Sequence, residues 1–242
     1  MLFRILFVVC GIAIVVFWAK EQVWDFLLAP SEWNFCTYRW IEKIAHSIGL
    51  NQFVFSKFEL DLITTELSSQ FMMHITTAMY LGLSGASPFV MYEAFRFISP
   101  ALYESEKKYS VQIAVIIYIL FALGLLITYF VLFPISLRFL GTYSVSERIH
   151  ATITLESYID TFTTLSLMMG VVFQLPIVSY ILGKMGVINY ELLSGYRKHS
   201  FIIIMIIAAI ITPPDIMTLM IVTFPLYLLF EASIQVLKYQ KK

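Results

Sequence analysis

The fold is decided by residues 109–137, which read YSVQIAVIIYILFALGLLITYFVLFPISL and contain no charged side chain. A helix that crosses a membrane needs roughly 20 largely apolar residues, because each residue advances the helix by about 1.5 Å and the hydrocarbon layer is about 30 Å thick. This stretch is long enough to cross without help from its flanks. It therefore predicts an integral membrane protein.

Similar uncharged stretches lie on both sides of this one. They cover residues 5–19, 67–92, 161–183, 200–214 and 216–230. We therefore expect an all-α polytopic membrane protein, a single transmembrane domain over residues 1–242 with six helices. The expected spans are about 2–20, 68–92, 109–137, 160–183, 200–212 and 216–236.

The last two stretches are short and are separated only by Asp215. They predict either one long kinked helix or a hairpin of two short helices that turns at Thr212-Pro213-Pro214-Asp215. Two consecutive prolines remove two backbone donors and disrupt the preceding turn, and an aspartate is a good N-cap for the next helix. The hairpin is the interpretation that we adopt.

The composition narrows the function. Only 13% of the residues are charged and 60% are hydrophobic, whereas soluble domains carry roughly a quarter charged residues. The net charge is zero, so nothing points to nucleic acid. Two cysteines, Cys10 and Cys36, are too few for a tetrahedral metal site, and we expect no metal, no cofactor and no redox chemistry.

The basic residues predict the orientation of the helices. Six spans place both termini on one side, and that side holds ten of the sixteen basic residues. Because loops that stay in the cytoplasm are enriched in lysine and arginine, both termini are expected to be cytoplasmic. Phe17-Trp18-Ala19 lacks the small residue that a signal-peptide cleavage site needs, so the first span is expected to stay as an anchor.

The longest segment between spans, residues 20–66, lies on the opposite, outer side in this arrangement. Its many aromatic and aliphatic residues predict short helices lying over the outer face. Residues 138–160 form a smaller segment of the same kind.

An enzymatic reading rests on Gly82-Leu83-Ser84-Gly85, which matches the G-x-S-G pattern of intramembrane serine proteases. A serine nucleophile needs a base within reach, and none of the four histidines falls in a later span. We therefore interpret the small residues as a site of close helix packing and expect no enzyme.

Two polar residues fall inside expected spans. Gln174 lies in the middle of the fourth span, where an amide needs a partner, either on a neighbouring helix or on a passing segment. Glu231 lies in the last span, where an ionisable group is a functional hypothesis by default, although it could also extend to the nearby cytoplasmic edge. Four spans contain a proline, which favours a curved bundle. These prolines are Pro88, Pro134, Pro176 and Pro225.

The stretch after the second span, residues 95–108, reads FRFISPALYESEKK and is the most informative part of the chain for function. It presents two acids, Glu104 and Glu106, on a face that is otherwise basic. A carboxylate in such a place can bind a guanidinium through two parallel hydrogen bonds. Alternatively, the two acids pair locally with Lys107 and Lys108.

That stretch resembles the signature of the TatC family, F-x-x-P-A-L-Y-x-x-E followed by two basic residues. The matching residues are Phe97, Pro100, Ala101, Leu102, Tyr103, Glu106, Lys107 and Lys108. Further motifs of the family occur in the same order along the chain. They are Ala29-Pro30, then Phe130, Phe133 and Pro134, then Phe173-Gln174-Leu175-Pro176, then Thr212-Pro213-Pro214-Asp215, and finally Pro225-Leu226-Tyr227-Leu228-Leu229-Phe230-Glu231.

The resemblance covers essentially the whole chain and implies a function. It implies a cupped six-helix bundle in the bacterial inner membrane that receives signal peptides with two consecutive arginines and exports folded proteins with the proton-motive force. It also implies small single-span partner subunits (TatA alone, or TatA and TatB) and a homo-oligomer within a complex.

The resemblance also assigns residues to roles. Signal-peptide binding falls to Phe97, Pro100, Leu102, Tyr103, Glu106 and Lys107. Contact with a partner helix falls to Gln174, Thr212 and Glu231. A structural role falls to Pro30, Pro134, Pro176, Pro213, Pro214 and Asp215.

The chain departs from the family in two places. Gln174 stands where many relatives have glutamate, so a titrating acid is not expected there. The family also opens with a cytoplasmic H-L-x-E-L-R stretch, whereas this sequence starts at Met1-Leu2-Phe3-Arg4. We expect the working protein to have an N-terminal acid that this sequence does not contain. The alternative function is a small secondary transporter or channel, which would place charges or broken symmetric helices along a pathway.

Overall fold

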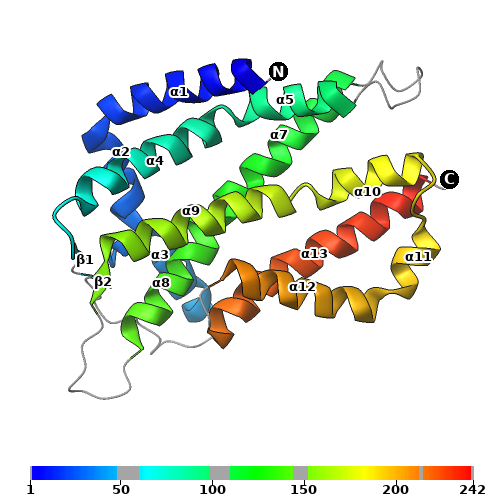
Figure 1. Ribbon diagram of the computed structural model, residues 1–242. Coiled ribbons are helices and arrows are strands. Elements are labelled where there is room, and N and C mark those ends of the chain that lie inside the picture. The colour runs from blue at the N-terminus through cyan, green and yellow to red at the C-terminus, as the bar shows by residue number, and fades with distance from the viewer. Residues whose placement is uncertain are drawn as a thin grey trace.

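The computed structural model describes residues 2–47, 60, 62–98, 110–143, 152–212 and 215–240, and nearly all of these are helical (Figure 1). The first half contains α1 (Leu2–Trp18), α2 (Lys20–Leu28), the 3-10 turn η1 (Ala29–Ser31), α3 (Cys36–Ser47), α4 (Ser69–Gly85) and α5 (Ser87–Ile98). The second half contains α7 (Ser110–Ile127), the π-helical turn η3 (Thr128–Leu132), α8 (Phe133–Thr142), α9 (Leu155–Val172), α10 (Leu175–Lys184), α11 (Tyr190–Gly195), α12 (Arg197–Ile211) and α13 (Ile216–Gln240).

Three helical segments within the described residues are long and apolar enough to cross a membrane: 112–142, 155–184 and 216–240. A fourth is added if α1 and the following segment up to Ser31, which bend by 88°, count as one span. α1 and α4 are each too short to cross alone, because their 17 residues span about 26 Å and the hydrocarbon layer is about 30 Å thick. The structure therefore supports a helical membrane protein, and the number of six spans stays a prediction.

The expected span over residues 68–92 is divided into two helices. α4 ends at Gly85, and α5 begins at Ser87 with Pro88 in its first turn. Proline is tolerated there because the first N–H groups of a helix have no partner within the helix. In the interior of a helix, Pro88 would remove a backbone hydrogen bond and clash with the preceding turn. The helix is therefore interrupted just before this proline.

The packing of α1 on α4 explains the small residues around Ser84. A Cβ atom added to Gly82 would lie 2.8 Å from Cβ of Ala13 and 2.9 Å from the carbonyl oxygen of Val9. Only glycine allows the two backbones to approach this closely. The interpretation of the G-x-S-G sequence as a packing site is therefore confirmed at Gly82.

The third expected span continues through a π-helical turn into α8. Pro134 has no N–H, so the carbonyl of Phe130, four residues earlier, loses its usual helical donor. The hydroxyl of Thr37 in α3 donates to that carbonyl instead. The π-helical turn η3 ends at Leu132, two residues before this proline; π-helical turns usually occur, as here, as single turns within a longer α-helix.

α12 and α13 form a hairpin, which decides between the two alternatives left open by the sequence. Phe201 of α12 contacts the ring of Tyr227 of α13 edge to face, with centroids 5.7 Å apart. The expectation that both helices are short is wrong for α13, which has 25 residues, about 38 Å. The helix runs on to Gln240 because residues 232–240, ASIQVLKYQ, contain no proline or glycine that would end it.

The short helices expected between the first two spans are present as α2 and α3. A parallel pair of two-residue strands joins the two expected outer segments, with β1 (Leu62–Ile63) paired to β2 (Ile153–Thr154). Thr154 also caps α9, because its hydroxyl accepts a hydrogen bond from the N–H of Ser157.

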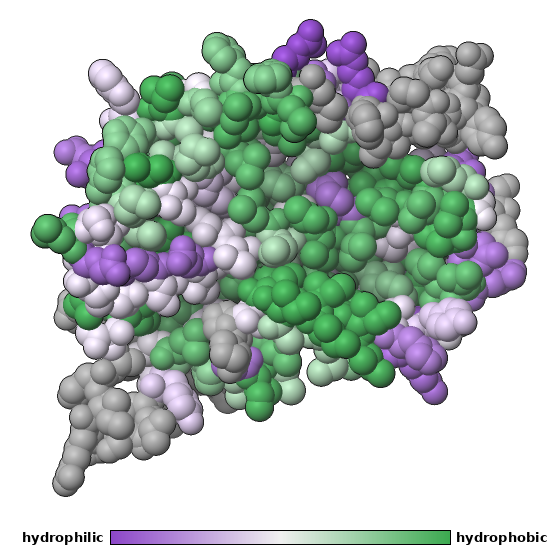
Figure 2. Space-filling view, in the orientation of Figure 1, coloured by the Kyte–Doolittle hydropathy of each residue, from purple (hydrophilic) through white to green (hydrophobic). Residues whose placement is uncertain are grey.

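The surface and the core are arranged as expected for a membrane protein. Figure 2 shows apolar residues over the middle of one face, with most hydrophilic residues toward its edges. Many large apolar side chains on α1, α7 and α12 are exposed, as lipid-facing residues would be. Inside, an aromatic cluster around Phe133, Tyr158 and Phe162 lies at one end, and an aliphatic cluster around Leu165, Met169 and Val222 lies beside it.

Candidate functional site

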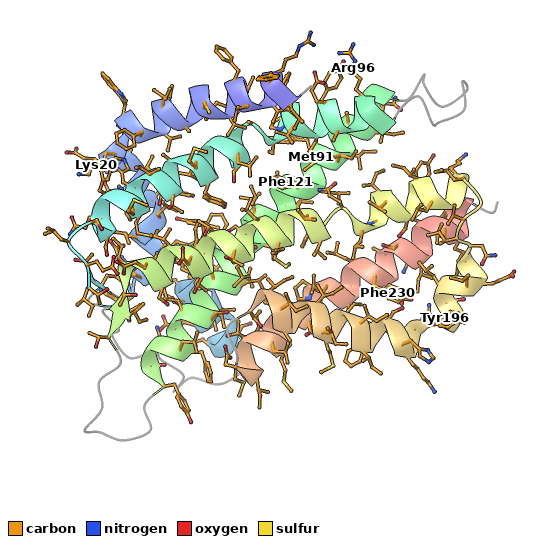
Figure 3. All side chains as sticks on the ribbon, viewed as in Figure 1. Lys20, Met91, Arg96, Phe121, Tyr196 and Phe230 are labelled. Atoms are coloured by element: carbon orange, nitrogen blue, oxygen red, sulfur yellow. The ribbon has the colours of Figure 1, made fainter. Side chains whose placement is uncertain are left out.

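The residues with expected roles are spread over two ends of the molecule. Figure 3 shows Lys20 at one end and Arg96 and Tyr196 at the other. We call the first the tyrosine end, defined by Tyr38, Tyr129 and Tyr158. We call the second the ionic end, defined by the pairs Arg4–Glu93 and Arg197–Glu231.

Most of the expected peptide-binding residues lie beyond the part of the chain that the structure describes. Phe97 is the penultimate residue of α5 at the ionic end. The other five lie in the segment 99–109, outside the described residues: Pro100, Leu102, Tyr103, Glu106 and Lys107. Two of the expected structural residues, Pro213 and Pro214, are also outside the described residues. Their roles stay predictions, and the structure describes the chain only up to Ile98 before this segment.

Glu93 of α5 places a buried carboxylate at the ionic end. Glu93 lies one turn before Phe97, its side chain is only 7% exposed, and its Oε1 is 3.9 Å from Nη1 of Arg4 on α1. The Arg4 side chain is 70% exposed. The distance is longer than a charge-assisted hydrogen bond, which is about 2.7–2.9 Å.

The second ion pair at this end is closer and joins α12 to α13. Arg197 Nη2 lies 2.6 Å from Glu231 Oε1, and Arg197 Nε donates to Oε2 over 3.2 Å. This two-point contact is the geometry in which arginine and carboxylate match best. Glu231 therefore neutralises a cation that would otherwise be unfavourable in the first turn of a helix.

Gln174 lies at the break between α9 and α10, where Pro176 begins the next helix. The backbone N–H of Gln174 bonds to the carbonyl of Val171, three residues back, which leaves the carbonyl of Gly170 without that donor. The side-chain Nε2 of Gln174 donates to Gly170 and also to Ile117 of α7, both over 3.2 Å. The amide therefore repairs the break and ties two helices together, while its Oε1 is buried without a hydrogen-bond partner.

The turn between α12 and α13 is closed by its own side chains. The Thr212 hydroxyl donates to the carbonyl of Ala208 over 2.9 Å. Asp215 caps α13, because its Oδ1 accepts from the N–H of Thr218 over 2.6 Å, which confirms the expected N-cap.

The tyrosine end is held by neutral hydrogen bonds to backbone carbonyls. The Tyr38 hydroxyl, on a side chain with 1% exposure, lies 3.1 Å from the carbonyl of Pro30 and 3.0 Å from that of Pro134. Burial raises the pKa of Tyr38 to about 12, so the hydroxyl keeps its proton at physiological pH. The guanidinium of Arg138 lies 5.1 Å above the same ring.

Two more tyrosines satisfy the end of α2. The last carbonyls of a helix have no partner within it. Tyr129 donates to the carbonyl of Phe26 and Tyr158 donates to that of Leu27, each over 2.7 Å. The hydroxyl of Ser31 donates to the carbonyl of Leu28 over 2.6 Å. The C-terminal end of α2 is therefore fixed by partners from the later spans.

Sequence reasoning missed three features of these ends: the tyrosine hydroxyls, Arg197 as the partner of Glu231, and the burial of Glu93. Arg197 and Glu231 are 34 residues apart, and only the hairpin that we expected brings them together. A signal for the tyrosines existed, since tyrosine buried in a span needs a partner for its hydroxyl.

The serine and histidine of the enzymatic reading are not arranged for catalysis. His74 lies ten residues before Ser84 on the same helix, about 15 Å away along the axis. Its ring stacks on Phe17 with centroids 4.1 Å apart. In the described part of the chain, no three histidine, cysteine, aspartate or glutamate side chains gather as metal ligands would.

The fold and its two ends define a class of protein: a helical integral membrane protein with polar groups fixed at both ends of an apolar bundle. Known proteins identify the family. Residues 1–225 match the model of the family described as Sec-independent protein translocase protein (TatC).

Curated relatives and solved structures agree with that match. A Sec-independent protein translocase protein TatC from Blattabacterium sp. subsp. Periplaneta americana (strain BPLAN) is 34% identical over 92% of this chain and 85% of the relative. The protein of the same name from Aquifex aeolicus is 36% identical over 73% of each chain. A crystal structure described as the twin arginine translocase receptor TatC superposes with a TM-score of 0.68, at 30% identity and 99% coverage of both chains. The chain belongs to the TatC family.

Proposed function

We propose that this chain is the signal-peptide receptor and core subunit of a twin-arginine translocase, which exports folded proteins with the proton-motive force. The observation that carries the proposal is the similarity over nearly the whole chain to the twin arginine translocase receptor, at 30% identity. The signature that includes Glu106 supports the same function, because a carboxylate on a basic face suits a guanidinium.

The protein would lie in the bacterial inner membrane with the ionic end in the cytoplasm, so that both termini are inside. The basic side chains at this end support that orientation, since cytoplasmic loops are enriched in lysine and arginine. They include Arg4 and Arg96 near α5, Lys184 at the end of α10, and Arg197 and Lys238 in the final hairpin.

Small single-span subunits would pack against the bundle as partners. Support comes from a groove of about 450 Å³ between α7, α10 and α13, which is mostly apolar and suits a partner helix. It is lined by Gln112, Ile113, Ile116, Leu120, Pro176, Ile177, Tyr180 and Val236. Gln174, Thr212 and Glu231 are the proposed polar contacts near such helices, and a homo-oligomer within the complex is part of the same proposal.

The test is the binding of a twin-arginine precursor to membranes that contain the full chain, followed by crosslinking. Glu106→Gln should weaken binding by roughly 10- to 100-fold, because a charge-assisted pair is worth about 1.5–3 kcal/mol. Glu104→Gln is the matched control and should change binding far less. Equal crosslinking of the precursor to the wild type and to Glu106→Gln, at equal protein levels, would contradict the proposed role of Glu106.

A further inference from the structure

α2 lies across one end of the bundle, whereas α1 runs along it (Figure 1). The bend between α1 and the segment Lys20–Ser31 is 88°. Trp18, the last residue of α1, is 86% exposed, and tryptophan is enriched where a membrane meets water. Because the exposed face of α1 is apolar, this helix is expected to lie in the membrane. α2 is then expected to lie along the membrane surface, at the depth of the lipid headgroups.

A groove of about 630 Å³ lies at this end, between α2, α4, β1 and the start of α9. We call it the α2 groove. Lys20, Glu21 and Asp25 of α2 supply its charged side chains, and Trp24 and Phe71 are among its apolar ones. Its volume is within the range of about 300–1,000 Å³ that is typical of sites for small molecules. The groove therefore offers both charged and apolar contacts at headgroup depth.

The charged residues of the α2 groove follow one another on a single helix. Glu21 and Asp25 are four residues apart, so they share one face of α2 with Trp24. Lys20 precedes them at the end of the molecule (Figure 3). Among the described residues, none of these three charged groups takes part in an ion pair. Two carboxylates one turn apart on a helix repel each other, so a cation that binds between them is favourable.

Aromatic rings join three helices at the α2 groove. His74 of α4 stacks on Phe17 of α1 with centroids 4.1 Å apart, and its centroid lies 6.5 Å from that of Trp24 on α2. Tyrosine hydroxyls hold the far end of α2, as described above. The groove is therefore formed before any ligand arrives, which lowers the cost of ordering its side chains on binding.

We propose that the α2 groove binds one membrane phospholipid whose headgroup carries a primary ammonium beside its phosphate. A primary ammonium has three N–H donors, which suit the carboxylates of Glu21 and Asp25, and the phosphate suits the ammonium group of Lys20. The acyl chains leave the groove past Phe71, which is 61% exposed on α4. The inference rests on the membrane fold and not on signal-peptide binding, so it goes beyond the proposed function.

Charge complementarity selects this lipid from its neighbours in the membrane. A choline headgroup carries the same charges, but its quaternary ammonium has no N–H group that could donate to a carboxylate. A glycerol headgroup leaves the lipid negatively charged, and the groove already has two acids and only one lysine. A metal ion does not suit the groove, because no three histidine, cysteine, aspartate or glutamate side chains of the described residues gather as ligands.

The experiment uses quenching of tryptophan fluorescence by phospholipids with brominated acyl chains. The full chain, with Trp18, Trp33 and Trp40 replaced by phenylalanine, keeps Trp24 as its one tryptophan and is placed in phosphatidylcholine vesicles. Brominated phosphatidylethanolamine should quench Trp24 more strongly than brominated phosphatidylcholine or phosphatidylglycerol at the same mole fraction. In the control protein, only Trp40 is kept, which is exposed on α3 outside the groove. The ethanolamine and choline lipids should quench Trp40 equally.

Substitutions of the charged residues separate the two contacts with the headgroup. In the protein that keeps Trp24, Glu21→Gln together with Asp25→Asn should weaken the apparent affinity for phosphatidylethanolamine by roughly 3- to 10-fold, the size expected of two exposed ion pairs. Lys20→Gln should weaken the ethanolamine and choline lipids alike, because both carry a phosphate. Glu32→Gln, at an exposed acid outside the groove, is the matched control and should change neither. All these side chains are exposed, so the variants should fold.

Four outcomes would overturn the inference. Equal quenching of Trp24 by the ethanolamine and choline lipids would mean that the groove does not select a headgroup. Stronger quenching by phosphatidylglycerol than by phosphatidylethanolamine would mean that it selects negative charge. An unchanged preference after Glu21→Gln with Asp25→Asn would mean that these acids do not bind the ammonium. The same loss of preference in Glu32→Gln would assign the effect to the overall charge of this end and not to the groove.

Discussion

The tyrosine end and the ionic end solve the same problem with different chemistry. At the tyrosine end, neutral hydroxyls donate to the carbonyls of Phe26, Leu27 and Pro30, and the participating rings are mostly buried. At the ionic end, partly exposed arginines pair with carboxylates on Glu93 and Glu231.

The difference indicates which end can exchange partners. A buried carbonyl at the end of a helix has no water nearby that could replace a tyrosine hydroxyl as its donor. Breaking that hydrogen bond therefore leaves the carbonyl buried without a partner, which is costly. A carboxylate beside a solvated arginine can accept another cation at little net cost. The molecule is therefore expected to be rigid at the tyrosine end and receptive at the ionic end.

Removing Tyr38 should have the largest effect on stability. Tyr38→Ala leaves a cavity and removes the hydroxyl that lies between the carbonyls of Pro30 and Pro134, so we expect a loss of about 3–5 kcal/mol, as for large-to-small substitutions of buried aromatic residues. Tyr38→Phe keeps the ring and should cost about 1–3 kcal/mol. Thermal unfolding in detergent and the amount of protein in membranes measure both. If Tyr38→Phe is as stable as the wild type, the hydroxyl does not contribute to holding α3 against η1 and α8.

The pair Arg197–Glu231 should contribute less, even though its contact distances are short. Its side chains are 42% and 33% exposed, so solvent screens the attraction. A double-mutant cycle with Arg197→Gln and Glu231→Gln should give a coupling free energy of about 1 kcal/mol. A coupling as large as the loss in Tyr38→Ala would mean that the two ends are equally rigid and would end the contrast between them.

Gln174 provides the finest test, since it lies between the two ends. Gln174→Leu removes the donor to Ile117 and Gly170 and should cost about 0.6 kcal/mol, the average for hydrogen bonds between membrane helices. We expect export to fall while membrane levels stay the same, and Gln174→Glu to retain export through a protonated acid. Full export by Gln174→Leu would mean that the amide only connects helices.

The sequence predicted the helices well because the membrane imposes a simple rule. Any uncharged stretch of sufficient length must satisfy its own backbone as a helix. The rule also places breaks at prolines, and the N-cap at Asp215 followed from its place after Pro214. It did not predict the break at Ala86, because a span that contains one proline usually continues as a kinked helix.

The polar contacts were much harder to predict. The tyrosine hydroxyls donate to backbone carbonyls. Because every residue has a carbonyl, the sequence does not show which residue is the partner. Nothing in the sequence distinguishes Glu93 from other acids, and only the structure shows that it is buried, with α1 packed against α5. The peptide-binding signature was found by its resemblance to a family, whose motif spacing is specific where single charges are not.

The hydroxyls that close α2 also set an order of events during synthesis. The partners of Phe26 and Leu27 stand 103 and 131 residues later in the chain. At 5–20 residues per second, the ribosome adds that length in roughly 5–26 seconds. During this time the two carbonyls lack their tyrosine donors, and water at the membrane surface is the donor that we expect to take their place. The end of α2 is therefore made early and fixed late, when Tyr129 and Tyr158 reach it from newly inserted helices.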